Sequence, residues 1–193
     1  MTSDTAPTTA FPVRRSRTRE LVSAALLAAM MAATSWIQIK FGPVPFTLQT
    51  AFVVLAALML APEWAAASMG VYLVLGAVGL PIFAGGVGGF AAFGLPTGGF
   101  LVAFPFAAGL GALTYRAARR IPGKAGSIGA PFVAVIVVEV VIYSIGVPWL
   151  IATTGMPVSG AIAVAMMPFL VPDAIKAGAA WVIATAVKRT TGD

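Results

Sequence analysis

The chain has 193 residues, of which 60% are hydrophobic and 9% are charged, and this excludes a soluble globule because soluble domains carry about 25% charged residues. The net charge of +6 comes from basic residues that cluster between apolar runs, a pattern typical of membrane topology rather than of nucleic-acid binding. Cysteine and histidine are both absent, which excludes disulfides, His-ligated metal sites and Ser-His triads, so we expect neither an enzyme nor a metal or cofactor site.

Apolar runs in chain order predict an all-α membrane protein with six transmembrane helices. Residues 1–19 are expected to form a disordered cytoplasmic tail, and residues 20–189 a single transmembrane domain. The first run is too long, and is followed by too many others, for a cleaved signal peptide. The second and third are short and could instead thin the bilayer or form a re-entrant hairpin. The expected spans are 21–39, 48–61, 64–80, 100–115, 128–150 and 162–187.

The basic residues are distributed unevenly among the connecting segments. If the N-terminus is inside, the outer loops hold only Lys40, and Lys176 falls within a span. Because positively charged loops stay on the cytoplasmic side, this asymmetry predicts a multi-pass protein of the cytoplasmic membrane with both termini inside. The ten basic residues of the cytoplasmic segments are Arg14, Arg15, Arg17, Arg19, Arg116, Arg119, Arg120, Lys124, Lys188 and Arg189.

Three charged residues, Glu139, Asp173 and Lys176, are expected within the spans. Placing one charged side chain near the centre of a membrane helix costs about 2.5–3.5 kcal/mol on insertion scales. This cost is tolerated where the charge faces a cavity or a partner. Asp173 and Lys176 are three residues apart and therefore share one helix face. This pattern predicts either a polar ligand site or an ion pair that joins the last two helices. Pro168 and Pro172 free backbone carbonyls beside the pair, which favours a cavity.

Two further segments are rich in small residues. Residues 84–99 read AGGVGGFAAFGLPTGG, and because each glycine costs a helix about 1 kcal/mol, the segment predicts a loop. This loop could approach a ligand closely or be a merely flexible connection, and it lacks the pattern of a nucleotide cradle. In the first helix, the small residues Ala25, Ala29 and Ala33 could admit a partner helix within lipid or pack internally.

Three motifs follow one another at a distinctive spacing: FGPVPFTLQT at 41–50, GLPIFAGGVGGFAAFGLPTGGF at 79–100 and PFLVPDAIKAGAA at 168–180. Together they resemble the BioY family, the biotin-specific S components of energy-coupling-factor (ECF) transporters, over about residues 20–187. The resemblance implies six helices with both termini inside and high-affinity biotin uptake. It also implies assembly with a transmembrane T component and two ATPase subunits, which use the ATP.

The resemblance further implies where biotin binds. The segment 41–49 would cover the pocket, and the glycine-rich loop and the last helix would line it. Asp173 would accept from the ureido N–H groups, and Lys176 would pair with the carboxylate or donate to the ureido oxygen. The helix face with Ala25, Ala29 and Ala33 would dock the T component. The expected ligand contacts are Asp173, Lys176, Thr47, Gln49, Thr97, Glu139, Gly85, Gly86, Gly88, Gly89, Gly98 and Gly99.

The sequence departs from the family pattern at two points. The usual G-P-T-G-G-Y reads LPTGGF at 95–100, so the tyrosine hydroxyl is absent, and the glycine-rich loop has no arginine for the ligand carboxylate. Glu139, Asp173 and Lys176 sum to −1, so either Glu139 faces away from an anionic ligand or it carries a proton. The alternatives left open are an S component for another vitamin, a stand-alone biotin carrier with a proton relay, and a scaffold with a buried ion pair. Whether the chain forms a homo-oligomer is also left open.

Overall fold

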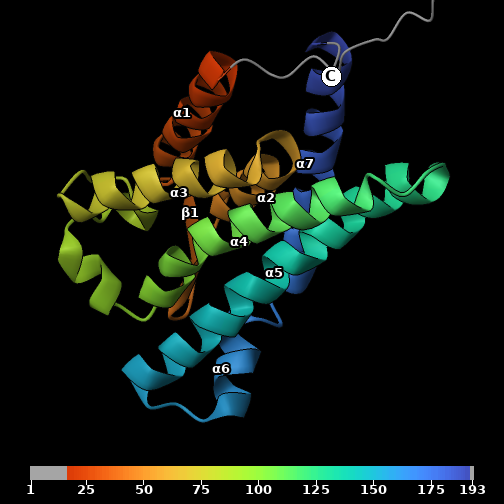
Figure 1. The fold of residues 1–193 in the computed structure, drawn as a ribbon. Coiled ribbons are helices and arrows are strands. Elements are labelled where there is room, and N and C mark those ends of the chain that lie inside the picture. The colour runs from red at the N-terminus through yellow and green to blue at the C-terminus, as the bar shows by residue number, and fades with distance from the viewer. Residues whose placement is uncertain (1–16, 192–193) are drawn as a thin grey trace, which may run out of the picture.

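The computed structural model describes residues 17–191 as a helical bundle with one β-hairpin (Figure 1). The first helix begins at Arg17, three residues before the expected start of the domain, and the rest of the expected tail lies outside the described residues. The helices are α1 (Arg17–Thr34), α2 (Gln49–Met59), α3 (Pro62–Ala77), α4 (Gly98–Ala118), α5 (Lys124–Thr154), α6 (Val158–Ala165) and α7 (Leu170–Thr191).

The centre of the bundle is α2, which packs against α1, α3, α4, α5 and α7. Residues 52–58 of this helix are all buried, so it is apolar on every side, as expected of a helix enclosed by others. Its eleven residues extend only about 17 Å, well short of the roughly 30 Å hydrocarbon core. After Leu60 and Ala61, Pro62 starts α3, and proline suits this first helical position because it needs no N–H there.

The expected first span is wrong over its last five residues, 35–39. The helix ends at Thr34 instead of running to residue 39, and the chain continues into the antiparallel hairpin of β1 (Gln38–Phe41) and β2 (Val44–Thr47). Gln38 lies opposite Thr47 in this hairpin. Gly42 has a φ of 70° in the two-residue turn, a conformation that glycine adopts without strain.

The expected sixth span is two helices rather than one. α6 ends at Ala165 and α7 begins at Leu170, with a turn between them. Pro168 lies in this turn and Pro172 in the first turn of α7, where a missing N–H removes no helical hydrogen bond. The break places Asp173 in the first turn of α7, at the positive end of the helix dipole.

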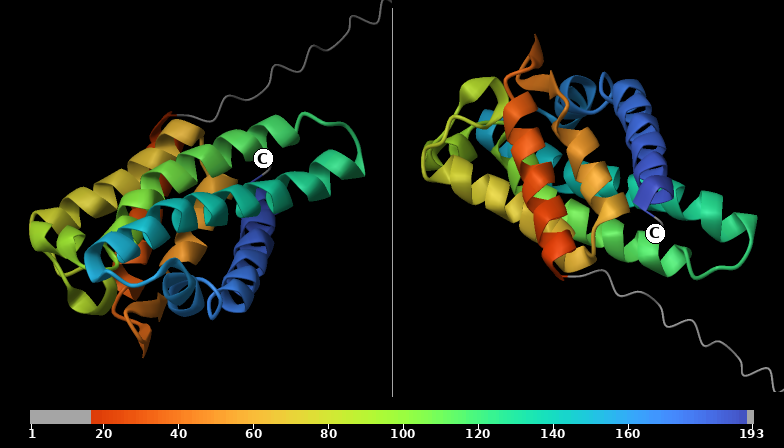
Figure 2. Two further views of the ribbon diagram at one scale, coloured as in Figure 1. Left: turned by 90° about the horizontal axis from the view of Figure 1, so that it is seen from below. Right: turned by 90° about the horizontal axis from the view of Figure 1, so that it is seen from above.

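Among the described residues, three helical segments are long and apolar enough to cross a membrane: Gly98–Ala118, Gly126–Thr154 and Leu170–Thr190. α4 and α5 run side by side in opposite directions in all the views of Figures 1 and 2. The α3–α4 connection is not a regular helix, as expected. It contains two short 3-10 turns, η1 (Ala84–Gly86) and η2 (Phe90–Gly94).

Candidate ligand-binding site

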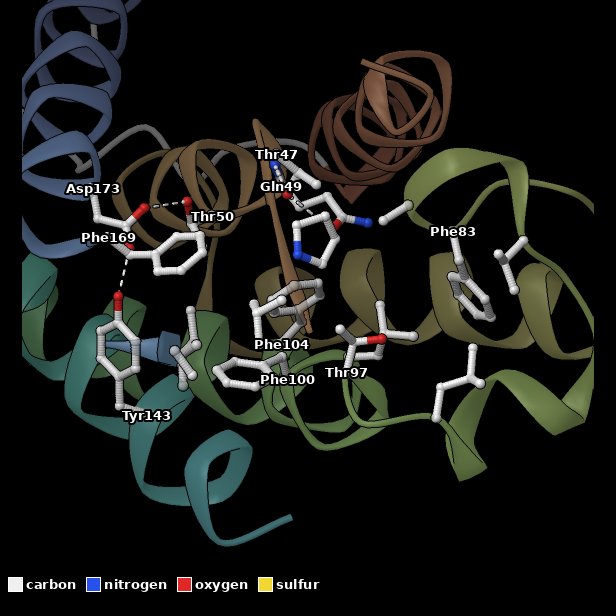
Figure 3. Close-up of a pocket in the computed structure, with 18 of the residues that line it drawn as sticks. Thr47, Gln49, Thr50, Phe83, Thr97, Phe100, Phe104, Tyr143, Phe169 and Asp173 are labelled. Atoms are coloured by element: carbon white, nitrogen blue, oxygen red, sulfur yellow. Dashed lines mark hydrogen bonds between the residues drawn. The ribbon is translucent and has the colours of Figure 1, made fainter. Parts of the chain in front are cut away.

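A cavity of about 110 Å³ lies inside the bundle, between the hairpin, α2, the glycine-rich segment, α4, α5 and α7 (Figure 3). Its wall is mostly apolar and aromatic, with a few polar side chains. Asp173, Thr50 and Tyr143 lie toward one end of it and Phe83 toward the other. The lining residues include Val44, Thr47, Gln49, Thr50, Phe83, Ala84, Val87, Leu95, Thr97, Phe100, Phe104, Tyr143, Phe169, Asp173 and Lys176.

Asp173 and Lys176 form a buried ion pair at the cavity, with 2.7 Å between Lys176 Nζ and Asp173 Oδ1. Both residues are under 10% exposed. Thr50 bridges them, because its hydroxyl donates to Asp173 Oδ1 at 3.1 Å and accepts from Lys176 Nζ at 3.1 Å. The hydroxyl of Tyr143 donates to the other carboxylate oxygen at 2.7 Å. Both oxygens of Asp173 are therefore held by protein donors.

The aromatic ring of Phe46 covers the charged pair from the hairpin side. Lys176 Nζ lies 4.1 Å from its centroid, within range of a cation–π interaction, and Phe46 itself stacks on Phe169. The ammonium group is thus held by a carboxylate, a hydroxyl and a ring.

The sequence analysis does not identify Thr50 or Tyr143 as site residues. Thr50 ends the FGPVPFTLQT segment, which was the only available signal, and Tyr143 lies in an otherwise apolar run.

Thr47 and Gln49 line the cavity and belong to a second polar network. Thr47 donates to Gln49 Oε1 at 3.1 Å, and Gln49 Nε2 donates to the hydroxyl of Tyr72 at 2.6 Å. Tyr72 in turn donates to the carbonyl of Ile82 at 2.8 Å. This chain of hydrogen bonds links the hairpin to α3 and to Ile82, just before the glycine-rich segment, and it fixes the Gln49 amide at the cavity wall.

Thr97 also lines the cavity, but the six glycines expected as ligand contacts are not among its lining residues. Gly98 and Gly99 begin α4 and are buried against the protein, where a Cβ on Gly99 would meet Trp149. Gly85 has a φ of 73° and donates its N–H to the carbonyl of Ser35 at 3.1 Å. The glycines thus allow close packing of the loop, and their neighbours, including Ala84, Val87 and Leu95, present side chains to the cavity.

Glu139 does not line this cavity. It lies in a separate apolar hollow between α5 and α7, together with Tyr143 and Asp173. Both of its carboxyl oxygens are buried and have no hydrogen-bond partner among the described residues. Of the three charges expected near mid-membrane, two meet at one site and the third lies beside it.

The alanine-rich helix α1 presents two different faces. Ala24 and Ala28 are buried, and the carbonyl of Ala24 accepts from Ser68 of α3 at 2.7 Å. Ala25, Ala29 and Ala33 are exposed, and they form a row of small residues at i, i+4 spacing. Large apolar side chains flank this row and are more than 40% exposed: Val22, Leu26 and Met30.

This architecture, a membrane helix bundle around an apolar cavity with a buried charged pair, defines the class of small-molecule-binding membrane proteins. The model of the BioY family matches residues 6–193, and the chain belongs to that family. A probable biotin transporter of Pyrococcus horikoshii is 36% identical over 175 residues, which cover 91% of this chain and 99% of the relative. A biotin transporter of Rhizobium etli is 36% identical over 88% of this chain and 93% of its own length.

A crystal structure at 2.1 Å of the S-component for biotin from an ECF-type ABC transporter has a similar fold. Its TM-score is 0.80, with 26% sequence identity, and the match covers 89% of this chain and 92% of that one. The family predicted from three sequence motifs is thereby confirmed.

Proposed function

We propose that this protein takes up biotin across the cytoplasmic membrane as the S component of an ECF transporter, and that the cavity of Figure 3 is its biotin site. The observation that carries the proposal is the buried Asp173–Lys176 pair at one end of an apolar cavity, in a member of the BioY family. Biotin has an apolar ring and chain, a ureido group and one carboxylate. An apolar pocket with a few placed polar groups suits such a ligand.

The geometry favours one orientation of biotin. Lys176 Nζ lies 2.7 Å from Asp173 Oδ1. The two side chains are therefore close enough to bind the same small group of the ligand, provided that this group carries both hydrogen-bond donors and an acceptor. The ureido group is of this kind, with its N–H groups donating to Asp173 and its oxygen accepting from Lys176. The carboxylate then points away from the charged pair, toward the part of the cavity that Thr97 lines. The N-terminus of α4 begins there, and the positive end of a helix suits an anion.

We also propose that the chain crosses the membrane six times, with α6 and α7 together as the last crossing and both termini in the cytoplasm. The basic residues at the end of α4, the start of α5 and the end of α7 support this orientation, since positive charge gathers on the cytoplasmic side. The exposed row of Ala25, Ala29 and Ala33 is the docking face for the T component, where small residues let another helix approach closely.

Replacing Asp173 or Lys176 with alanine tests the binding site. We expect each change to weaken biotin binding roughly 10- to 150-fold, because a hydrogen bond to a charged group contributes about 1.5–3 kcal/mol. Lys124→Ala is the matched control, since Lys124 is exposed and is not among the residues that line the cavity. Unchanged affinity in both cavity variants would contradict the assignment.

An uptake assay separates an S component from a stand-alone carrier. Cells that carry the chain with its T component and ATPases should accumulate biotin, and an inactive ATPase should abolish this accumulation. Uptake that survives the inactive ATPase and collapses with the proton gradient would favour the carrier instead.

A further inference from the structure

A second hollow, of about 600 Å³, lies at the basic end of the bundle, between the end of α4, the start of α5 and the end of α7. It shares no lining residue with the cavity of Figure 3. It combines cationic, hydroxyl and apolar side chains, and no acidic side chain is among the described residues that line it. The lining residues are Tyr115, Arg119, Ser127, Pro131, Trp181, Val182, Thr185, Ala186, Lys188 and Arg189.

The cationic groups come from two helices and meet at this hollow. Lys188 is held in place by Tyr115, whose hydroxyl accepts from Nζ at 2.8 Å and whose ring centroid lies 4.3 Å from Nζ. Arg119 and Arg189 are exposed beside it. Three positive charges thus face one opening, and Ser127 and Thr185 add hydroxyl groups. Their charge complements a negatively charged group.

Next to this hollow, beginning at Phe132, a mostly apolar groove lies between α5 and α7, and its polar residues are Glu139, Tyr143 and Asp173. α7 packs mainly on α2, and it meets α5 where Tyr143 donates to Asp173, near the start of α7. Phe132, Ile136 and Leu170 line the groove and are each more than 40% exposed. From Ser127 to Ile136 the hollow and the groove together follow α5 for about 14 Å, close to the roughly 15 Å thickness of one leaflet of hydrocarbon.

We propose that this groove binds an anionic phospholipid. Its phosphate lies among Arg119, Lys188 and Arg189, and one acyl chain lies between α5 and α7 toward Ile136. A basic pocket between membrane helices, with an apolar continuation one leaflet deep, recognises both parts of such a molecule. A soluble phosphate would meet the charges but gain nothing from the groove. A zwitterionic lipid would fill the groove with no net charge to match the cations.

Native mass spectrometry of the purified chain in detergent tests the proposal, with phosphatidylglycerol and phosphatidylcholine of identical acyl chains as probes. We expect the wild type to retain phosphatidylglycerol in preference. The double variant Arg119→Gln/Arg189→Gln should bind it roughly 25-fold more weakly, at about fivefold for each basic residue. Arg120→Gln/Lys124→Gln removes the same charge from the same end. Neither residue lines the hollow, so this control should retain the lipid.

Three results would overturn the proposal. Equal retention of the two lipids would show that charge is not recognised, as expected of a groove that serves a partner helix instead. Equal loss in the two double variants would show a diffuse surface effect rather than a site. Binding of glycerol phosphate as strong as that of phosphatidylglycerol would show that the apolar groove contributes nothing.

Discussion

Lys176→Met is the substitution that probes the charged pair most sharply. It leaves the carboxylate of Asp173, which is 4% exposed, without its cation. Breaking a buried ion pair in this way destabilises a protein by about 3–5 kcal/mol. Thr50 and Tyr143 still donate to the carboxylate, so we expect the lower end, about 3 kcal/mol. In a chain of this size that lowers the Tm by about 6–12 °C.

The double variant Asp173→Asn/Lys176→Met should recover most of this loss, because no unpaired charge remains and the carbonyl of the introduced asparagine still accepts from Tyr143 or Thr50. Thermal unfolding in detergent, followed by the fluorescence of the four tryptophans, measures the wild type, Lys176→Met, Asp173→Asn and the double variant. Biotin binding should be lost in the double variant even though its stability returns. A double variant destabilised by the sum of the two single changes would refute the coupling. A double variant that is stable and still binds biotin with wild-type affinity would show that the Asp173–Lys176 pair stabilises the fold and does not bind the ligand.

The other predictions concern the cavity, the packing and the docking face. Tyr143→Phe removes the 2.7 Å hydrogen bond to Asp173, and calorimetry should show biotin binding weakened roughly tenfold or more with the fold intact; unchanged affinity would contradict this. Gly111→Ala should destabilise the protein by about 1–3 kcal/mol, because its Cβ would meet side chains of α2 and α5, whereas Gly70→Ala, with nothing within 4 Å, should not lower the Tm. Ala29→Leu should leave biotin binding unchanged but reduce co-purification with the T component, and undiminished assembly would exclude this face.

The sequence was informative wherever a residue type carries a strong physical cost. Charges at Asp173 and Lys176 are expensive within a membrane helix, so their presence predicts either a polar ligand site or an ion pair, and in the structure they form an ion pair at the cavity. The glycine-rich loop followed from helix propensity in the same way. Glu139 has the same cost but lies in another hollow, because the rotation of α5 about its axis is set by packing and not by sequence spacing.

Features that depend on tertiary contacts could not be read from the chain. The apolar run 21–39 does not reveal that α1 ends at Thr34, since Trp36 and Ile39 suit a strand as well as a helix. Pro168 indicates an interruption of the helix before α7, but the sequence does not distinguish a complete break from a kink. Thr50 and Tyr143 carry no signal in the sequence, because their role depends on the packing of α2 and α5 beside α7, which places both hydroxyl groups at Asp173.

Calorimetry of the purified protein with biotin, and with riboflavin and thiamine as controls, tests the central claim most directly. The account predicts saturable binding of biotin at about one site per chain and no binding of the other two vitamins. Binding of riboflavin or thiamine in place of biotin would contradict the assigned ligand. Binding of none of the three by folded protein would contradict the assignment of the Asp173–Lys176 cavity as a vitamin site.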